Sequence, residues 1–287
     1  MILVVGATGQ VGGMVANQLL AQKRKIRILV RPPSNYKPLQ EAGAEVAFGD
    51  LKDRASLDKA CQSIDTIITT ANSAKRGGVD NPQTVDLEGN RSLIDAGKKA
   101  GLKHFIFVSV NIADPNSPVP FLQAKGKTEH YLQSSGLSHT ILAPDFFMED
   151  WIGMVVARPV AEGQPVTVVG AGERRHSFVS ALDVAKFIVA CVDNPLAANR
   201  KLIIGGPDAV SFRDAAATFS RVTGRQIEVR SIQPNQPVPG IPDPVLPLLA
   251  ALDTFDSVLD MKEVSHQFGV ELTSMEDFAR LSMSGRG

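Results

Sequence analysis

The sequence contains little cysteine, and several motifs that would mark common classes of enzyme are missing. Its two cysteines, Cys61 and Cys191, lie in apolar helical patterns without CxxC spacing. They are typical of reduced core residues in a cytoplasmic protein and exclude a disulfide framework. None of the histidines has a partner at metal-ligand spacing, so we expect no metal site. A Gly-x-Ser-x-Gly sequence is also absent, which argues against a serine hydrolase.

An excess of one charge and a long apolar run are lacking as well. Lys+Arg and Asp+Glu number 30 each among 287 residues, so no net field points to nucleic acid or to an anionic membrane. The apolar run Val245–Leu252 is far shorter than the ~20 residues that span a bilayer, and we expect no membrane span. Because the chain starts directly with a predicted strand, we also expect no signal peptide and a cytoplasmic location.

The first twelve residues are the most informative part of the chain. Ile2–Val5 is an apolar run that predicts a buried strand, and a helical pattern follows from Val11 to Gln22. The glycine-rich turn between them would aim free N–H groups and the positive end of a helix dipole at one point, which suits a dinucleotide pyrophosphate. The alternative is an ordinary glycine-rich turn. The predicted cofactor-binding residues here are Gly6, Thr8, Gly9, Gln10, Val11 and Gly12.

Strand and helix patterns alternate from residue 1 to about 143, which predicts an α/β fold with a doubly wound parallel sheet. The predicted strands are Ile2–Val5, Ile26–Val30, Glu45–Phe48, Thr66–Thr70, His104–Val108 and Thr140–Leu142. The predicted helices lie near residues 11–23, 36–42, 55–62, 84–100 and 121–135. Further on, the patterns predict short strands over 166–169 and 176–179, a returning strand over 201–204, and helices over 184–192, 211–223 and 274–283, the last opened by a capping box that starts at Thr273.

Arg31 follows the second predicted strand. A fold that binds NAD usually has Asp or Glu at this place, where the carboxylate binds the adenosine ribose. A guanidinium would instead hold a 2′-phosphate through two parallel hydrogen bonds, and Lys37 would add a second positive charge. Arg31 therefore favours NADP(H) over NAD(H) as cofactor, the alternative being a solvated surface arginine.

Two more strand ends fit the same cofactor. Asp50 and Leu51 follow the third strand, where Asp50 would accept a hydrogen bond from the adenine amino group or serve as a local turn or capping residue. Thr70, Ala71 and Asn72 close the fourth strand with small side chains that leave room for ribose and pyrophosphate. Neither stretch by itself is specific for a cofactor, although both are compatible with one.

Taken together, these residues carry a resemblance to a known family. The glycine turn Gly6–Gly12, Arg31, Gly49-Asp50, and the runs over 85–110 and 175–185 resemble the atypical short-chain dehydrogenases/reductases, in the NmrA-like, isoflavone-reductase-like branch. The similarity is strongest over 1–205. It implies an NAD(P)-binding Rossmann domain over 1–145 and a substrate lobe over 146–287, with a strand and helix near 176–205 returning to the first domain.

The resemblance also implies catalytic residues. The family's Tyr-x-x-x-Lys pair corresponds here to Phe121 and Lys125, four residues apart on one helix face, and Ser109 matches the family's serine. In the family this lysine holds the nicotinamide ribose, so the resemblance implies that Lys125 also binds the cofactor. Phe121 has no proton to give. Three alternatives follow. Lys125 would position the substrate and donate the proton, or Tyr131 or a water bound to Ser109 would donate the proton in place of the missing tyrosine. In the third, the site binds a cofactor without turnover. The alternatives are a solvated Lys125 paired with Glu129 and a Ser109 that only caps its strand.

An aromatic segment follows the sixth strand. Phe146, Phe147 and Trp151 would line an apolar substrate pocket, pack a small lobe, or do both. We therefore expect an NADPH-dependent reductase, a monomer or homodimer, that acts on a small apolar carbonyl, enone or quinone. The second hypothesis is a non-catalytic NADP(H)-binding sensor, regulator or assembly factor with a protein partner, which Phe121 favours. A sugar-nucleotide epimerase ranks third, because that chemistry depends on the missing tyrosine.

Overall fold

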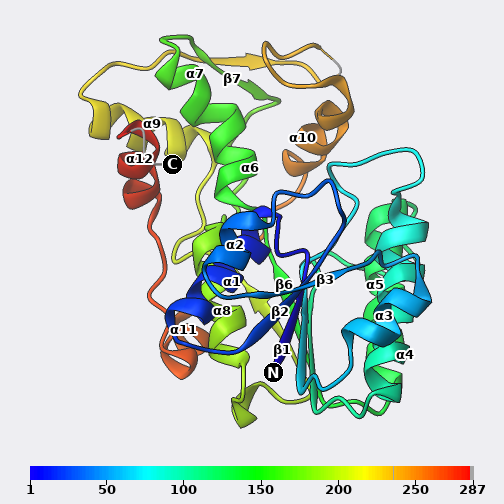
Figure 1. The fold of residues 1–287 in the computed structure, drawn as a ribbon. Coiled ribbons are helices and arrows are strands. Elements are labelled where there is room, and N and C mark those ends of the chain that lie inside the picture. Colours follow the sequence, from blue (N-terminus) through cyan, green and yellow to red (C-terminus); the bar gives the residue numbers. More distant parts are fainter. Residues whose placement is uncertain (235, 285–287) are drawn as a thin grey trace. The chain divides into compact units, whose positions relative to one another are not determined.

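The computed structural model describes residues 1–234 and 236–284. The chain divides into two compact units, each traced by two separate segments (Figure 1). Unit 1 consists of Met1–Pro144 and Val184–Ile203, and unit 2 consists of Asp145–Asp183 and the residues from Ile204 onward. Each unit has its own apolar core.

A seven-stranded sheet forms the centre of unit 1, with the strand order β3-β2-β1-β4-β5-β6-β8. Its strands are β1 (Ile2–Val5), β2 (Ile26–Val30), β3 (Glu45–Phe48), β4 (Thr66–Thr69), β5 (His104–Val108), β6 (His139–Pro144) and β8 (Arg200–Ile204). All pairings from β3 through β6 are parallel, with Ile2 opposite both Ile26 and Thr66. The order 3-2-1-4-5-6 is that of the Rossmann fold, so the predicted fold class is confirmed.

Helices connect the strands on both faces of this sheet (Figure 1). They are α1 (Gln10–Ala21), α2 (Lys37–Glu41), α3 (Arg54–Ala60), α4 (Asn90–Lys99), α5 (Pro120–Ser134) and α8 (Ala181–Cys191), with the short η3 (Pro195–Ala197). On one face, α3, α4 and α5 cover the side chains of Leu3, Ile67 and Phe105, which are fully buried. Burial of apolar side chains on both faces explains why these strands are continuous apolar runs in the sequence.

The helix predicted near 84–100 begins as a π-helix, η1 (Pro82–Gly89), and continues as α4. Asn81 caps η1, since its side chain accepts a hydrogen bond from the Thr84 N–H. The wider turn leaves carbonyl groups that need other donors. The buried side chain of Asn90 donates to the Val85 carbonyl at 3.0 Å, and Thr128 donates to the Asp86 carbonyl at 2.8 Å. The Thr128 bond joins η1 to α5.

Unit 2 packs helices around a two-stranded parallel sheet, β7-β9. Its elements are α6 (Met148–Ile152), the π-helix η2 (Gly153–Ala157), α7 (Arg158–Ala161), β7 (Val166–Val169), α9 (Phe212–Thr223), β9 (Val229–Ile232), η4 (Asp243–Val245), α10 (Leu246–Leu252), α11 (Lys262–Phe268) and α12 (Met275–Met283). Its core includes Ile152, Val156 and Phe219, all fully buried.

Two details of unit 2 differ from the sequence-based expectation. The strand predicted over 176–179 is wrong, because His176 and Val179 make only isolated bridges, to Val210 and Ser257 and to Phe147. The last helix is capped by Ser274, whose side chain accepts from the Asp277 N–H, and not by Thr273. Both Ser-x-x-Asp and Thr-x-x-Glu satisfy the same capping pattern, so the sequence alone does not choose between them.

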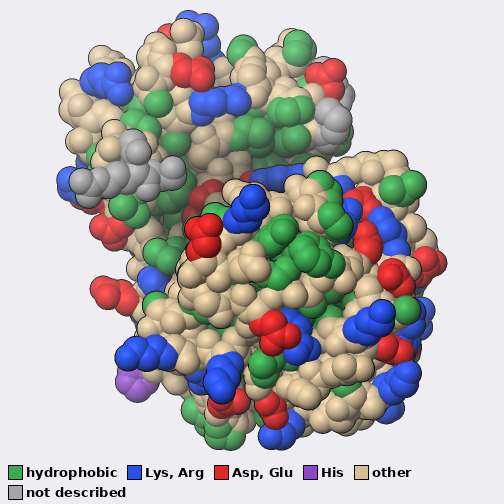
Figure 2. Space-filling model, viewed as in Figure 1, with side chains coloured by type: hydrophobic (Ala, Val, Ile, Leu, Met, Phe, Trp, Pro, Cys, Tyr) green, Lys and Arg blue, Asp and Glu red, His purple; other side chains and the backbone are tan. Residues whose placement is uncertain are grey.

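Lysine and arginine side chains alternate with acidic ones across the face drawn in Figure 2, as the equal totals of 30 and 30 would suggest. None of the helices in the described part of the chain has both the length and the apolar character needed to cross a membrane.

Candidate cofactor-binding and catalytic site

The predicted site residues of unit 1 follow the ends of neighbouring parallel strands. Gly6 follows β1, Arg31 follows β2, Asp50 comes just after β3, Thr70 follows β4 and Ser109 follows β5. Because these strands are parallel, their carboxyl ends meet at one edge of the sheet. Ligands of open α/β sheets bind at this edge.

The glycine turn is built by close backbone contacts. Gly6 has φ +89°, which favours glycine, and its carbonyl accepts a hydrogen bond from the Gly9 N–H at 2.9 Å. A Cβ on Gly12 would lie 2.2 Å from the Gly6 oxygen, so no other residue fits there. The first intrahelical bond of α1 runs from Gly13 to Gly9.

The first turn of α1 has no anionic or side-chain cap. Gln10 and Val11 precede the first intrahelical donor, the first turn holds no acidic side chain, and Gly9 offers no capping group. Thr8, Gly9 and Gln10 are exposed. Such a helix start presents N–H groups and a partial positive charge to an anion. The turn therefore fits a pyrophosphate.

Arg31 lies in a cluster of charged side chains and is not a lone surface arginine. Its guanidinium donates to Asp80 Oδ2 at 2.7 Å, and Arg76 donates to the same oxygen at 3.2 Å. Lys52 donates to the other oxygen of Asp80. Lys52 and Arg76, rather than the predicted Lys37, are thus the basic groups that share a carboxylate with Arg31. No sequence pattern marked them, since Arg76 and Asp80 lie in a segment without periodicity.

Asp50 takes part in a local turn. Its Oδ1 accepts the Lys52 N–H at 2.9 Å, and its Oδ2 lies 3.8 Å from Arg31. The cap of α3 is Asp53 instead. Leu51 is buried in the core of unit 1, against Gly89. A shallow depression lies beside Asp50, lined by Arg31, Pro32, Pro33, Phe48, Gly49, Asp50, Asp53 and Ser56.

The end of β4 packs directly on the glycine turn. The Thr70 N–H donates to the Val5 carbonyl at 3.0 Å, and a Cβ on Gly6 would lie 2.6 Å from Thr70 Oγ1 and 2.9 Å from the Ala71 nitrogen. Asn72 is exposed, and its Nδ2 donates to the Thr70 carbonyl at 3.2 Å. These residues shape the edge beside Gly6.

Lys125 is buried, so the interpretation as a solvated helix lysine paired with Glu129 is wrong. Only 2% of its surface is exposed. Its Nζ donates to the Val108 carbonyl at 3.1 Å and lies 3.3 Å from Asp86 Oδ1. The rings of Phe107 and Phe121 flank the ammonium, with centroids at 4.9 and 5.6 Å. Helix α5 thus places Lys125 at the carboxyl end of β5.

Asp86 is the site residue that the sequence analysis missed. Its carboxylate is fully buried, and Oδ2 accepts from the Ser73 N–H and hydroxyl at 3.0 and 2.6 Å. The carboxylate therefore binds the loop after β4 on one side and contacts Lys125 on the other. A signal was present in Asp86 and Asn90, two polar residues four apart in a predicted helix, on the face that the structure buries.

Ser109 and Tyr131 are both engaged by carboxylates. The buried Ser109 hydroxyl donates to Glu129, whose other oxygen accepts from Lys201 at 2.7 Å. Tyr131 donates to Asp95 at 2.6 Å, and this hydrogen bond together with burial raises the pKa of the phenol. Each hydroxyl therefore donates its hydrogen bond to a carboxylate in this structure, and a role of either in proton transfer stays a prediction.

In unit 2, the predicted pocket residues form part of an aromatic cluster. Phe146 packs edge to face on Trp151 and on His176, with centroids 5.8 and 5.2 Å apart. Phe147 forms a bridge with Val179. Phe146 and Trp151 pack against the core of unit 2, which is one of the two roles expected from the sequence. A substrate-lining role for these residues stays a prediction.

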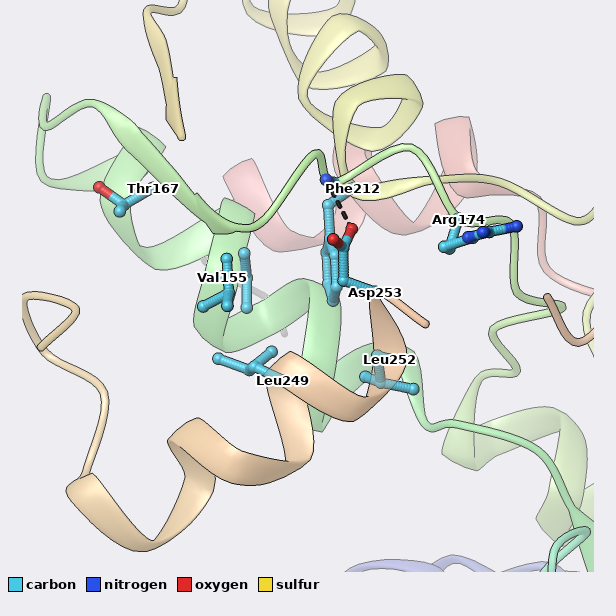
Figure 3. Close-up of a pocket in the computed structure, with 9 residues that line it drawn as sticks. Val155, Thr167, Arg174, Phe212, Leu249, Leu252 and Asp253 are labelled. Carbon is cyan, nitrogen blue, oxygen red and sulfur yellow. Dashed lines mark hydrogen bonds between the residues drawn. The ribbon is translucent and has the colours of Figure 1, made fainter. Parts of the chain in front are cut away.

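Asp253 is one of the residues that line a small pocket within unit 2 (Figure 3). The carboxylate accepts from the N–H groups of Ala171 and Gly172 at 3.0 and 2.8 Å. A Cβ on Gly170 would collide with this carboxylate. Arg174 extends from the same turn and pairs with Asp256. Both charged groups at this pocket are therefore used by the fold.

No three His, Cys, Asp or Glu side chains of the described residues are placed to hold a metal ion together.

The sheet order and the glycine turn define an α/β protein of the Rossmann class. The chain belongs to the NmrA-like family, which it matches over residues 1–281, and the resemblance seen in the sequence is confirmed.

Three similar proteins have different described roles. The chain is 30% identical to an NAD(P)H azoreductase from Xenophilus azovorans over 236 residues, covering 82% of this chain and 78% of that protein. It is 31% identical to the photosystem II assembly factor Ycf39 of Cyanophora paradoxa over 231 residues, or 80% and 71% of the two chains. The structure of Citrobacter sp. triphenylmethane reductase complexed with NADP(H) has the same fold, with a TM-score of 0.82, 21% identity, and 98% and 99% of the two chains covered.

The buried pair of Lys125 and Asp86 predicts a specific pattern of stability. Asp86→Asn should lower the free energy of unfolding by about 3–5 kcal/mol, because it leaves a buried ammonium without its counter-charge. The double variant Lys125→Met/Asp86→Asn should regain most of this loss, since both charges are gone. Urea unfolding of the wild type and the two variants measures both effects. A single variant as stable as the wild type would contradict a buried ion pair.

The buried His176 leads us to expect that the stability of the protein depends on pH. It is 1% exposed, its Nε2 donates to the Leu252 carbonyl at 2.9 Å, and burial lowers its pKa below the ordinary 6.5. As pH falls through 6.5, the unfolded chain binds a proton before the folded one does, so stability should be lost on acidification, by at most about 1.4 kcal/mol per pH unit.

Unfolding measured between pH 7.5 and 5 tests this expectation against His176→Gln, which keeps an N–H donor but does not titrate. The variant should lose less stability over the same range. His104, whose pKa burial also lowers, is present in both proteins and cancels in the comparison. Equal slopes for the two proteins would show that His176 is not the group responsible.

Proposed function

We propose that the protein is an NADP(H)-dependent reductase of a small apolar carbonyl, enone or quinone, with Lys125 as the group that holds the ribose or gives the substrate a proton. The observation that carries the proposal is the pairing of an uncapped glycine turn with the basic cluster of Arg31, Lys52 and Arg76 at one edge of the sheet. This set provides donors for a pyrophosphate and for a 2′-phosphate.

The relatives support the same cofactor and reaction class. One is named as an NAD(P)H azoreductase, and the triphenylmethane reductase structure contains NADP(H). Both names describe the reduction of organic compounds. The residues that surround the glycine turn here fit that cofactor on the contacts described above.

Bound NADPH would supply a hydride, and the protein would have to supply a proton to the reduced oxygen or nitrogen. Phe121 has no ionisable group, and Ser109 and Tyr131 donate to Glu129 and Asp95. Lys125 Nζ donates a hydrogen bond to the Val108 carbonyl at the end of β5. Asp86 holds the ammonium in place, and the rings of Phe107 and Phe121 shield it from water.

The second candidate is an NADP(H)-binding assembly factor or sensor without turnover. The similarity to the photosystem II assembly factor is as high as that to the azoreductase. In addition, Phe121 stands in the place of the proton donor, and Asp86 holds Lys125 inside the protein. A cofactor-binding site without a mobile acid is what such a protein would need.

Cofactor choice is tested by titrating cofactor-free protein with NADPH and NADH while fluorescence is recorded. Arg31→Ala should weaken NADPH binding by about tenfold or more, because a charge-assisted contact to the 2′-phosphate is lost. NADH affinity should change little, since NADH has no such phosphate. Equal weakening of both would defeat the 2′-phosphate assignment.

Turnover is tested by following NADPH absorbance with a panel of quinones, enones and azo dyes. The double variant Lys125→Met/Asp86→Asn should bind NADPH but consume it at least about a hundredfold more slowly, as expected for loss of the acid. Lys127→Ala removes an exposed lysine of the same helix and should leave the rate unchanged. Consumption that persists in the double variant would exclude Lys125 as the proton donor, and NADPH binding without any consumption would favour the assembly factor or sensor.

A further inference from the structure

Asp80 binds the basic groups to which we assign the 2′-phosphate. Its Oδ2 accepts from Arg31 at 2.7 Å and from Arg76 at 3.2 Å, and its Oδ1 accepts from Lys52. Its side chain is 13% exposed, although it lies in a surface loop. Hydrogen bonds from Lys52 and Arg31 lower the pKa of Asp80, so the carboxylate is charged at neutral pH.

The Asp80 carboxylate binds these basic side chains in the way that a phosphate would. Two oxygens that share one negative charge are each bound by a cation, which is the donor arrangement that a phosphate uses. An Arg31 guanidinium that already bonds to Asp80 cannot give the same N–H to a phosphate. A carboxylate and a phosphate that bind the same cation would also repel each other. Asp80 and a 2′-phosphate would therefore compete for these donors.

We propose that Asp80 is a specificity-determining residue, whose carboxylate competes with the 2′-phosphate for Arg31, Lys52 and Arg76 and so narrows the preference for NADPH over NADH. This inference rests on the proposed cofactor site. NADPH must displace Asp80 to bind in full, whereas NADH leaves Asp80 with its three cations. The free energy needed to break these ion pairs weakens the binding of NADPH and leaves the binding of NADH unchanged.

The position of Asp80 in the chain makes such a displacement feasible. It precedes Asn81, the capping residue of η1, and follows the exposed residues Gly77, Gly78 and Val79. A Cβ on Gly77 or Gly78 would meet no atom within 4 Å, so the space beside these glycines is open. The loop has its own hydrogen bonds, from the Asp80 N–H to the Gly77 carbonyl and from Asn81 to the Gly78 carbonyl, and a rotation of the Asp80 side chain alone would keep them. Asp80 can leave Arg31 without disturbing the buried Asp86 that follows it.

The test uses NADPH, NADH, 2′,5′-ADP and 5′-AMP as probes, each titrated into the full chain by calorimetry. Asp80→Asn keeps the shape of the side chain and removes its charge. The dissociation constants of NADPH and 2′,5′-ADP should each fall by about fivefold, the size expected for partly exposed ion pairs, with those of NADH and 5′-AMP changing by less than about twofold. The two probes 2′,5′-ADP and 5′-AMP lack the nicotinamide, so they report the subsite without any turnover.

Asp58→Asn is the matched control, because it also neutralises a surface aspartate that is paired with two basic residues, Arg54 and Lys99. It should leave all four affinities unchanged. Asp80→Ser provides a second neutral variant if asparagine disturbs folding. In an Arg31→Ala background, Asp80→Asn should lose most of its effect, since the main cation for which Asp80 and the 2′-phosphate compete is gone.

Failure of the inference and failure of the proposed function give different results. If the wild type and Asp80→Asn bind none of the four probes, the cofactor site is wrong and the inference falls with it. If the wild type binds NADPH but both neutral variants bind NADPH and 2′,5′-ADP no more tightly, the cofactor site stands and the competition is disproved. A matching gain for NADH and 5′-AMP would also overturn it, because the effect would then not involve the 2′-phosphate.

Discussion

The buried ion pair of Lys125 and Asp86 is the interaction on which the candidate site depends. A charge that is removed from water must be paired, and here the pairing joins three segments: α5 carries Lys125, η1 carries Asp86, and the loop after β4 donates two hydrogen bonds through Ser73. Asn90 and Thr128 donate to carbonyls of η1, and the Thr128 bond ties η1 to the helix that carries Lys125.

One stretch of chain, between β4 and α4, supplies the counter-charges for two of the cations that we propose to lie at the cofactor. Asp80 pairs with Arg31, and Asp86 pairs with Lys125 six residues later. The two pairs differ in environment. Arg31 and Asp80 are partly exposed and bonded through a loop, whereas Lys125 and Asp86 are buried. The exposed pair is weak enough to exchange with a ligand, while the buried pair is costly to break.

The sequence predicted the central sheet well, because its inner strands are buried on both faces and appear as apolar runs, as in β1 and β5. The glycine turn was predictable for a related reason: Gly12 touches the Gly6 carbonyl so closely that only glycine fits. The parallel order of the strands then places Arg31 and Ser109 at the edge that follows them.

The pairing of charges was not predictable. Spacing along α5 suggested Glu129 as the partner of Lys125, yet Glu129 binds Ser109 and Lys201, and Lys125 turns inward to Asp86 on another helix. Local spacing records which residues share a face, but it does not record which neighbour a helix packs against. The same limit hid Lys52, Arg76 and Asp80, and it produced the wrong strand over 176–179, where single bridges replace a ladder.

The discontinuous path of the chain sets an order in which the protein can form during synthesis. Unit 1 is completed only by Val184–Ile203, which bring α8 and the edge strand β8, so its sheet stays open beside β6 until the ribosome has released residue 203. The intervening Asp145–Asp183 must meanwhile wait for α9 and α12, which provide much of the apolar surface of its core. A nascent chain of this kind has an unpaired strand edge and an unburied aromatic segment at the same time, which is the state that chaperones bind.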